Sequence, residues 1–100
     1  MESKHYREER TERENIIKEI GIGEAVATFR VDRGHKNGAE LHTITTTAII
    51  IVRNERTHKM ITKLIARPKQ IERYFDERTE EVIELMKIAR EHQRKGYNEM

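Results

Sequence analysis

The chain of 100 residues contains no cysteine, no tryptophan and one proline. The lack of cysteine excludes disulfides, thiolate metal sites and cysteine nucleophiles. The longest unbroken apolar run, Ala48–Val52, is far shorter than a membrane span. The polar segment Met1–Lys4 has no apolar stretch, so we expect no signal peptide and a cytoplasmic protein.

Apolar residues are also scarce, because they make up 35% of the chain whereas charged residues make up 38%. A chain of this length predicts one domain over residues 1–100, with a small core. The apolar residues are clustered along the sequence, which favours a folded protein over a disordered one. We therefore expect a small folded domain with long exposed helical faces.

Positive charge gathers in one segment although the net charge of the chain is only +2. Between Arg53 and Phe75 the anions are Glu55 and Glu72. The cations of this segment are Arg53, Arg56, Lys59, Lys63, Arg67, Lys69 and Arg73. A basic segment on an acidic body suits a polyanionic partner. Lys and Arg also protect exposed sheet edges, and both interpretations stay open.

Hydrophobic periodicity predicts an α+β fold with an N-terminal helix, a three-stranded antiparallel meander and two C-terminal helices. The expected elements are a helix over residues 1–20, an antiparallel sheet over residues 24–67 with strands over 24–32, 39–53 and 59–67, helices over residues 68–95, and a frayed tail over residues 96–100. The pair Asn37-Gly38 favours a hairpin turn between the first two strands. Pro68 suits the first turn of a helix.

His42 lies on the polar half of the long central strand, ahead of a run of threonines. A histidine here can act as a general acid or base near neutral pH. A hydrogen-bonded structural histidine is the alternative. The threonines on the opposite face are strand formers by propensity, and hydroxyls of this kind can also contact phosphates.

The strongest phosphate-site candidate combines Lys63, Arg67 and the helix that begins at Pro68. Residues four apart on a strand point to the same face, and helix N-termini attract anions. Lys69 and Arg73 add positive charge nearby, and Arg53 precedes them on the central strand. Arg–phosphate contacts can be bidentate. Pairing with carboxylates of the same chain is the alternative.

The glycine-rich loop between the first two strands places His35, Lys36 and Asn37 where they could contact a ligand. The chain's five histidines are scattered and match no metal-binding spacing. We therefore expect no metal and no cofactor.

The order of helix, meander and basic final strand resembles the compact ribonuclease fold of barnase, RelE-type toxins and tRNA-cutting colicins. His5-Tyr6-Arg7-Glu8-Glu9-Arg10 is similar to a His-x-x-Glu-Arg pattern expected in phage-borne relatives. Residues 25–75 also resemble uncharacterised small proteins of Firmicute phages and prophages. The nuclease resemblance implies that the residues to test are His5, His42, Thr62 and Arg67. This chain departs from it by adding two helices after the last strand.

Three functional hypotheses follow from these patterns. The first is a phage-type nucleic-acid-binding protein, for RNA rather than DNA, whose enzymatic form is a metal-independent endoribonuclease with His42, His5 and Thr62 as catalytic residues. The second is a non-catalytic phage protein that binds and inhibits a host defence protein in the host cytoplasm. The third is a small homodimeric regulator.

Overall fold

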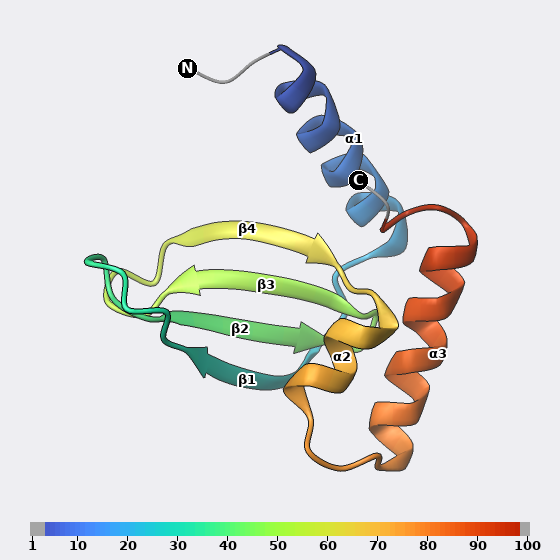
Figure 1. The fold of residues 1–100 in the computed structure, drawn as a ribbon. Helices are drawn as coiled ribbons and strands as arrows, with labels where there is room; N and C mark the ends of the chain where they lie inside the picture. Colours follow the sequence, from blue (N-terminus) through green and yellow to red (C-terminus); the bar gives the residue numbers. More distant parts are fainter. Residues whose placement is uncertain (1–3, 99–100) are drawn as a thin grey trace.

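The computed structural model describes the backbone of residues 4–98 and the side chains of residues 11–98. In chain order the elements are α1 (Lys4–Ile20), β1 (Ala25–Val31), β2 (Glu40–Thr45), β3 (Ile49–Asn54), β4 (Met60–Ile65), α2 (Pro68–Tyr74) and α3 (Glu80–Arg94). Helix, sheet and helices follow one another, which confirms the α+β class and the order of the elements (Figure 1).

Within residues 4–98 the sheet has four antiparallel strands in the order β1-β2-β3-β4. The prediction of three strands was therefore wrong. The segment 39–53, expected as one long strand, is a hairpin in which His42 pairs with Val52 and Ile44 pairs with Ile50. The apolar second half of this segment forms the separate strand β3 and does not continue β2.

A tight turn over Thr46–Ala48 separates β2 from β3, and threonine hydroxyls stabilise it. The Ala48 backbone N–H donates to the Thr45 carbonyl at 3.0 Å, and Ala48 adopts a left-handed φ of 60°. The Thr45 hydroxyl accepts from the Ile49 N–H at 3.2 Å. Threonine side chains can replace backbone partners in this way, so the same residues that favour strands also permit this turn.

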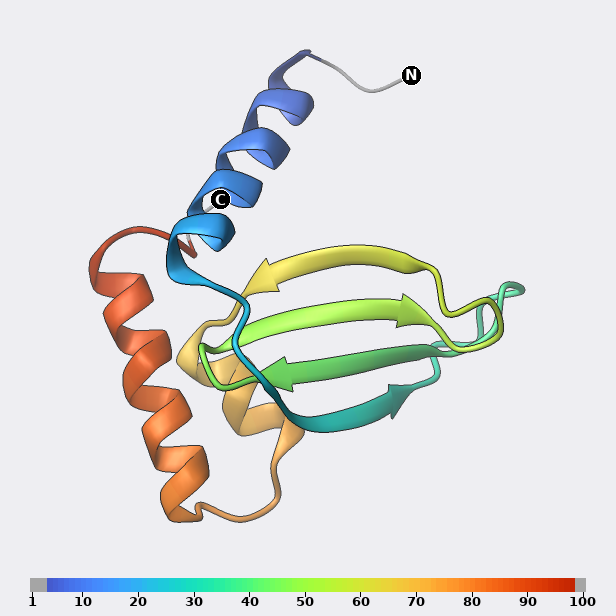
Figure 2. The same ribbon diagram turned by 180° about the vertical axis from the view of Figure 1, so that it is seen from behind.

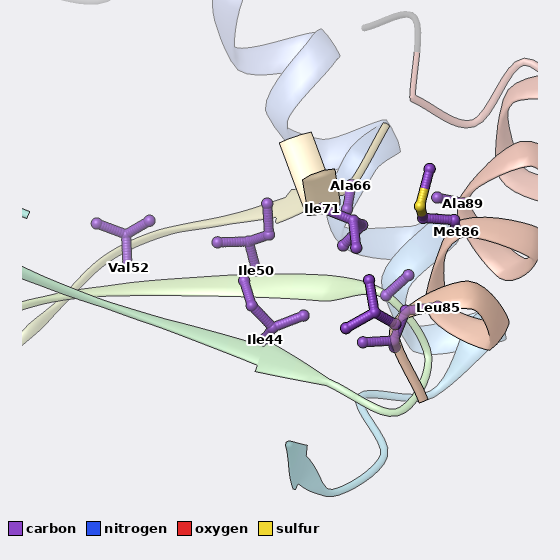
Figure 3. Close-up of a cluster of buried hydrophobic side chains, with 10 residues drawn as sticks. Ile44, Ile50, Val52, Ala66, Ile71, Leu85, Met86 and Ala89 are labelled. Carbon is purple, nitrogen blue, oxygen red and sulfur yellow. The ribbon is translucent and has the colours of Figure 1, made fainter. Parts of the chain in front are cut away.

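The main core lies between one face of the sheet and the two C-terminal helices. Ile44 and Ile50 from the sheet are fully buried against Ile71 of α2 and Leu85 and Met86 of α3 (Figure 3). Buried positions on α3 recur every three or four residues, as an amphipathic helix requires. We call this the helix-covered face. Val52, also on it, lies further along the sheet from α3 (Figure 3).

A smaller core lies on the other face of the same sheet, where α1 packs. Ile17 of α1 is buried against Ile49 and Ile65. Both views show α1 next to the β4 edge, with its N-terminal half extending beyond the sheet (Figure 1 and Figure 2). The sheet is thus layered on both faces at one end. The β1–β2 and β3–β4 loops lie at its other end (Figure 1).

Helix starts follow the sequence signals. Pro68 occupies the first turn of α2, and the Gln70 side-chain oxygen accepts from the Arg67 N–H at 2.8 Å. Thr79 caps α3 by accepting from Val82 at 3.2 Å. Beyond α3, where a frayed tail was expected, Asn98 is buried, while residues 99–100 lie outside the described part.

Candidate functional site

A chain of polar side chains crosses the helix-covered face from β2 to α2. His42 Nδ1 lies 2.5 Å from Tyr74 Oη, and His42 Nε2 lies 3.0 Å from Glu40 Oε1. A carboxylate only accepts, so Nε2 carries the proton and donates to Glu40. In the neutral ring Nδ1 then accepts from the Tyr74 hydroxyl. The arrangement aligns Tyr74, His42 and Glu40 for proton transfer.

An aromatic cluster lies beside the ring of Tyr74. The Phe29 ring centroid lies 5.4 Å from that of Tyr74 and 5.1 Å from that of Phe75. Burial raises the pKa of Tyr74 above its ordinary value, Glu40 raises it further, and the positive charge of Arg33 opposes both. The phenol therefore keeps its proton at neutral pH, and Arg33 is close enough to act on it electrostatically.

A hollow of about 440 Å³ opens beside these groups, and we call it the Tyr74 pocket. Its lining is aromatic and basic, and includes Phe29, Arg30, Val31, Arg33, His42, Leu64, Gln70, Arg73 and Tyr74. Arg30 is engaged, because its Nε lies 2.6 Å from Glu55 Oε1. Within residues 11–98, neither Arg33 nor Arg73 forms an ion pair with a carboxylate. Two guanidinium groups are thus available at this pocket.

A second hollow, of about 570 Å³, lies at the loop end of the sheet, and we call it the loop pocket. His35, Lys36 and Asn37, the residues predicted to contact a ligand, all line it, together with Arg56. Glu40 lines it too. Since Glu40 is bonded to His42 of the Tyr74 pocket, the two hollows are neighbours.

A third hollow, of about 100 Å³, lies where α1, the end of β4 and the C-terminal turn meet, and we call it the Arg13–Arg67 hollow. Leu64 and Gln70 line both this hollow and the Tyr74 pocket. The three hollows therefore follow one another, and each is lined by at least two Lys or Arg side chains.

The structure does not gather Lys63 and Arg67 into one pocket. Lys63 Nζ lies 3.2 Å from Glu14 Oε2 of α1, on the face that Thr43 and Ile51 share. Arg67 Nε donates to the Asn98 carbonyl at 2.8 Å. Because β4 ends at Ile65, the alternation of strand side chains does not extend to residue 67. The expected pairing relied on that alternation.

The other predicted residues are dispersed. Arg73 and His42 meet at the Tyr74 pocket, but Arg53 donates to the Thr43 hydroxyl at 3.1 Å on the opposite face. Thr62 accepts from Arg13 Nη2 at 3.3 Å, and Lys69 is exposed on α2. The side chain of His5 lies outside the described residues.

Sequence reasoning missed the contributions of Glu40, Arg33, Gln70 and Tyr74. Glu40 could have been identified from the sequence, because it lies two residues before His42 and residues two apart on a strand point to the same face. No sequence pattern identifies Tyr74 or Arg33, because their positions depend on how α2 and the β1–β2 loop fold back over the sheet.

Comparisons with protein-family models, curated proteins and solved structures gave no match. Among the described residues no cluster of His, Asp and Glu side chains could hold a metal ion. The helices of this part of the chain include none that is both long and apolar enough to cross a bilayer.

Proposed function

We propose that the chain binds single-stranded RNA on the helix-covered face and around the β4 edge, with the Tyr74 pocket at the centre of the interface. The observation that carries this proposal is the row of three neighbouring hollows, each with two or more basic side chains. A linear polyanion matches such a row better than a compact ligand does.

Phosphate contacts are the first part of the interface. Arg33 and Arg73 present guanidinium groups at the Tyr74 pocket that no carboxylate of residues 11–98 neutralises. Guanidinium groups bind phosphates bidentately, and fixed positive charge steers a polyanion to the surface. Lys36 and Arg56 extend the positive charge to the loop pocket.

Base contacts are the second part, and they favour an unpaired strand. Phe29 and Tyr74 provide aromatic surface at the same pocket as the two arginines. Unpaired bases stack on such rings, with about 1–3 kcal/mol per base, whereas a duplex keeps its bases stacked on each other. Polar side chains such as Gln70 can contact the 2′-hydroxyl that distinguishes RNA from DNA.

Mobility shifts with single-stranded RNA, single-stranded DNA and duplex DNA, at about 50 mM and about 200 mM salt, test this proposal. Arg73→Gln and Lys63→Gln form a matched pair, because each removes one positive charge and only Arg73 lines the Tyr74 pocket. We expect RNA affinity to fall roughly tenfold for Arg73→Gln and little for Lys63→Gln. Equal losses, or preferred binding of duplex DNA, would contradict the proposal.

A second candidate is metal-independent cleavage of the bound RNA, favoured by the Glu40–His42–Tyr74 chain beside Arg33 and Arg73. The 2′-oxygen would bond to phosphorus while the bond to the 5′-oxygen breaks. Tyr74 Oη would take the 2′-hydroxyl proton as its own proton passes to His42 Nδ1, and Glu40 would stabilise the imidazolium. Water would protonate the leaving 5′-oxygen, and the hydroxide that remains would take a proton from Tyr74 as His42 Nδ1 returns its proton to the phenol, so both residues regain their starting forms. The arginines would stabilise the charged phosphate.

Incubation of labelled RNA with the protein in excess EDTA tests the cleavage candidate. We expect products that end in a 2′,3′-cyclic phosphate, and none from RNA with a 2′-deoxy residue at the cleaved position. Tyr74→Phe keeps the ring for stacking but removes the hydroxyl, so it should bind RNA and not cut it. RNA that stays intact with the wild-type protein rejects cleavage and leaves the binding proposal in place.

A further inference from the structure

The two edges of the sheet differ in how they are protected. At the β4 edge, Arg13 of α1 donates to the Thr62 hydroxyl at 3.3 Å, and Glu14 of α1 lies 3.2 Å from Lys63 Nζ. At the other edge, β2 is the one described element that pairs with β1, so the outer side of β1 is open (Figure 1). An open edge presents backbone N–H and C=O groups that have no partner in the sheet.

The sequence of β1 lacks the features that usually protect such an edge. Protected edges are short, or carry Lys, Pro or inward-pointing charges. β1 spans seven residues without Lys or Pro, and its irregular pairing is confined to its start, between Ala25 and Ala27. Five of the seven residues are apolar, yet none of the seven is buried. The strand is therefore suited to pairing with a further strand.

A groove of about 370 Å³ lies between the start of β1 and α3, and we call it the edge groove. Its apolar lining includes Val26, Leu85 and Ile88. Its charged lining is Glu80, Glu81 and Glu84, and none of these carboxylates forms an ion pair within residues 11–98. The helix dipole favours acidic residues in the first turn of α3, which explains Glu80 and Glu81 but not Glu84. The edge groove thus matches a strand that brings a positive charge.

The opposite end of β1 carries such a charge. Arg33 follows the strand by two residues, is exposed, and forms no ion pair with a carboxylate of residues 11–98. Its neighbour Arg30 is already paired, with Glu55 at 2.6 Å and Asp32 at 3.7 Å. Arg33 lines the Tyr74 pocket, on the same face of the sheet as α3. When two identical strands pair antiparallel, each end of one strand meets the opposite end of the other.

We propose that the β1 edge binds a second copy of this chain, strand against antiparallel strand, about a two-fold axis at Phe29. Arg33 of each copy then comes alongside Ala25 of the other copy, one residue from Val26 and the edge groove. The guanidinium meets Glu84 there, and the symmetry makes this contact twice. The interface is self-complementary, so the pair is closed and needs no third copy.

The same register sets no like charges against each other across the two strands. Thr28 lies opposite Arg30, and Ala27 lies opposite Val31. This contact does not depend on RNA binding, but Arg33 cannot serve Glu84 of a second copy and an RNA phosphate at once. RNA and the second copy therefore compete for this one side chain.

Sedimentation equilibrium of the full chain without RNA measures the association. An interface of one strand pair and two ion pairs is small, so we expect a dimer of about twice 11.9 kDa with a Kd of roughly 10–100 μM. A single species of 11.9 kDa at about 1 mM protein would overturn the proposal.

Charge-reversal variants test the predicted contact. Arg33→Glu and Glu84→Arg should each weaken the dimer by about tenfold or more, because each change acts at two symmetric contacts, and the double variant should recover most of the loss. Arg56→Glu is the matched control, because it makes the same change at an exposed arginine of the loop pocket and should leave the dimer unchanged. A double variant as weak as the single variants, or an equal loss with Arg56→Glu, would overturn the proposal.

Isotope-filtered NMR on a mixture of labelled and unlabelled chain locates the paired strands. We expect intermolecular contacts between Thr28 and Arg30, and between Ala27 and Val31. Intermolecular contacts confined to other elements would overturn the β1 assignment even for a dimeric chain. A dimer with the expected contacts supports this inference whether or not RNA binds, so its outcome is separate from that of the RNA proposal.

Discussion

His42 Nδ1 and Tyr74 Oη lie 2.5 Å apart and join strand β2 to the end of helix α2 across 32 residues of sequence. Their rings are tilted by 51° with centroids 5.6 Å apart, so the contact is a hydrogen bond at the ring edges and not a stack. Both residues line the Tyr74 pocket, and the bond orients the imidazole between a phenol and a carboxylate.

Removing the Tyr74 hydroxyl should destabilise the protein. Tyr74→Phe leaves Nδ1 of a histidine that is 4% exposed without its donor, and a buried unsatisfied acceptor costs about 1–3 kcal/mol. Urea unfolding measures the loss. Tyr97→Phe serves as the control, because the Tyr97 hydroxyl makes no hydrogen bond within residues 11–98, and we expect a change within about 0.5 kcal/mol. Equal stabilities of the two variants would contradict the assigned bond.

The pKa of Tyr74 predicts how this contribution depends on pH. Burial raises the pKa of Tyr74 above its ordinary value of 10.0. A raised folded-state pKa means that the stabilisation is complete below the unfolded pKa and is lost as pH rises through the folded pKa. Over the alkaline range, in which the imidazole is neutral, the stability difference between wild type and Tyr74→Phe should thus be constant up to about pH 10 and shrink above it.

Phenolate absorbance gives an independent measure of the same pKa. The titration curve of Tyr74→Phe subtracted from that of the wild type isolates the Tyr74 phenol. We expect a midpoint above 10.0, the ordinary value. A midpoint at or below this value would show that the ring is more hydrated than the structure indicates.

Local sequence signals predicted most of the fold. Pro68 marked the start of α2, and hydrophobic periodicity predicted a strand over residues 24–32, where β1 spans Ala25–Val31. The error lay at Thr46–Ala48, where no glycine marks the turn and a left-handed alanine takes its place. Propensity could not locate this turn, because threonine favours strands and its hydroxyl contacts with the turn backbone are visible only in three dimensions.

The candidate site was less predictable than the fold. The sequence identified His42 on its strand but not its two hydrogen-bond partners. Glu40 lies on the same strand, and Tyr74 lies on helix α2, 32 residues away. Arg67 was identified for its charge, but charge alone did not distinguish it from Lys63, which pairs with Glu14. Periodicity assigns residues to faces within an element, whereas the hollows form between elements.

His58 offers a route to a more stable protein. It is exposed and has a φ of 60° in the β3–β4 turn, where its N–H donates to the Asn54 carbonyl at 2.9 Å. A left-handed backbone is costly for residues with a Cβ, so His58→Gly should raise the free energy of unfolding by about 0.5–1 kcal/mol. His58→Ala keeps the Cβ and should show no such gain in thermal unfolding. If both variants were stabilised alike, relief of backbone strain would not be the cause.

Gly23 and Gly34 share a φ of 73° but differ in their surroundings, which makes them a matched pair. A Cβ on Gly34 would meet no atom within 4 Å, whereas a Cβ on Gly23 would lie 2.3 Å from the Thr46 hydroxyl. Gly34→Ala should therefore lower the free energy of unfolding only by the cost of placing an alanine in a left-handed backbone conformation, about 1–2 kcal/mol. Gly23→Ala should cost roughly 1 kcal/mol more, because the displaced Thr46 hydroxyl loses its 3.1 Å hydrogen bond from the Glu24 N–H. Chemical denaturation of both variants tests the difference. Equal costs would mean that the 21–24 linker does not pack against the β2–β3 turn as the structure has it.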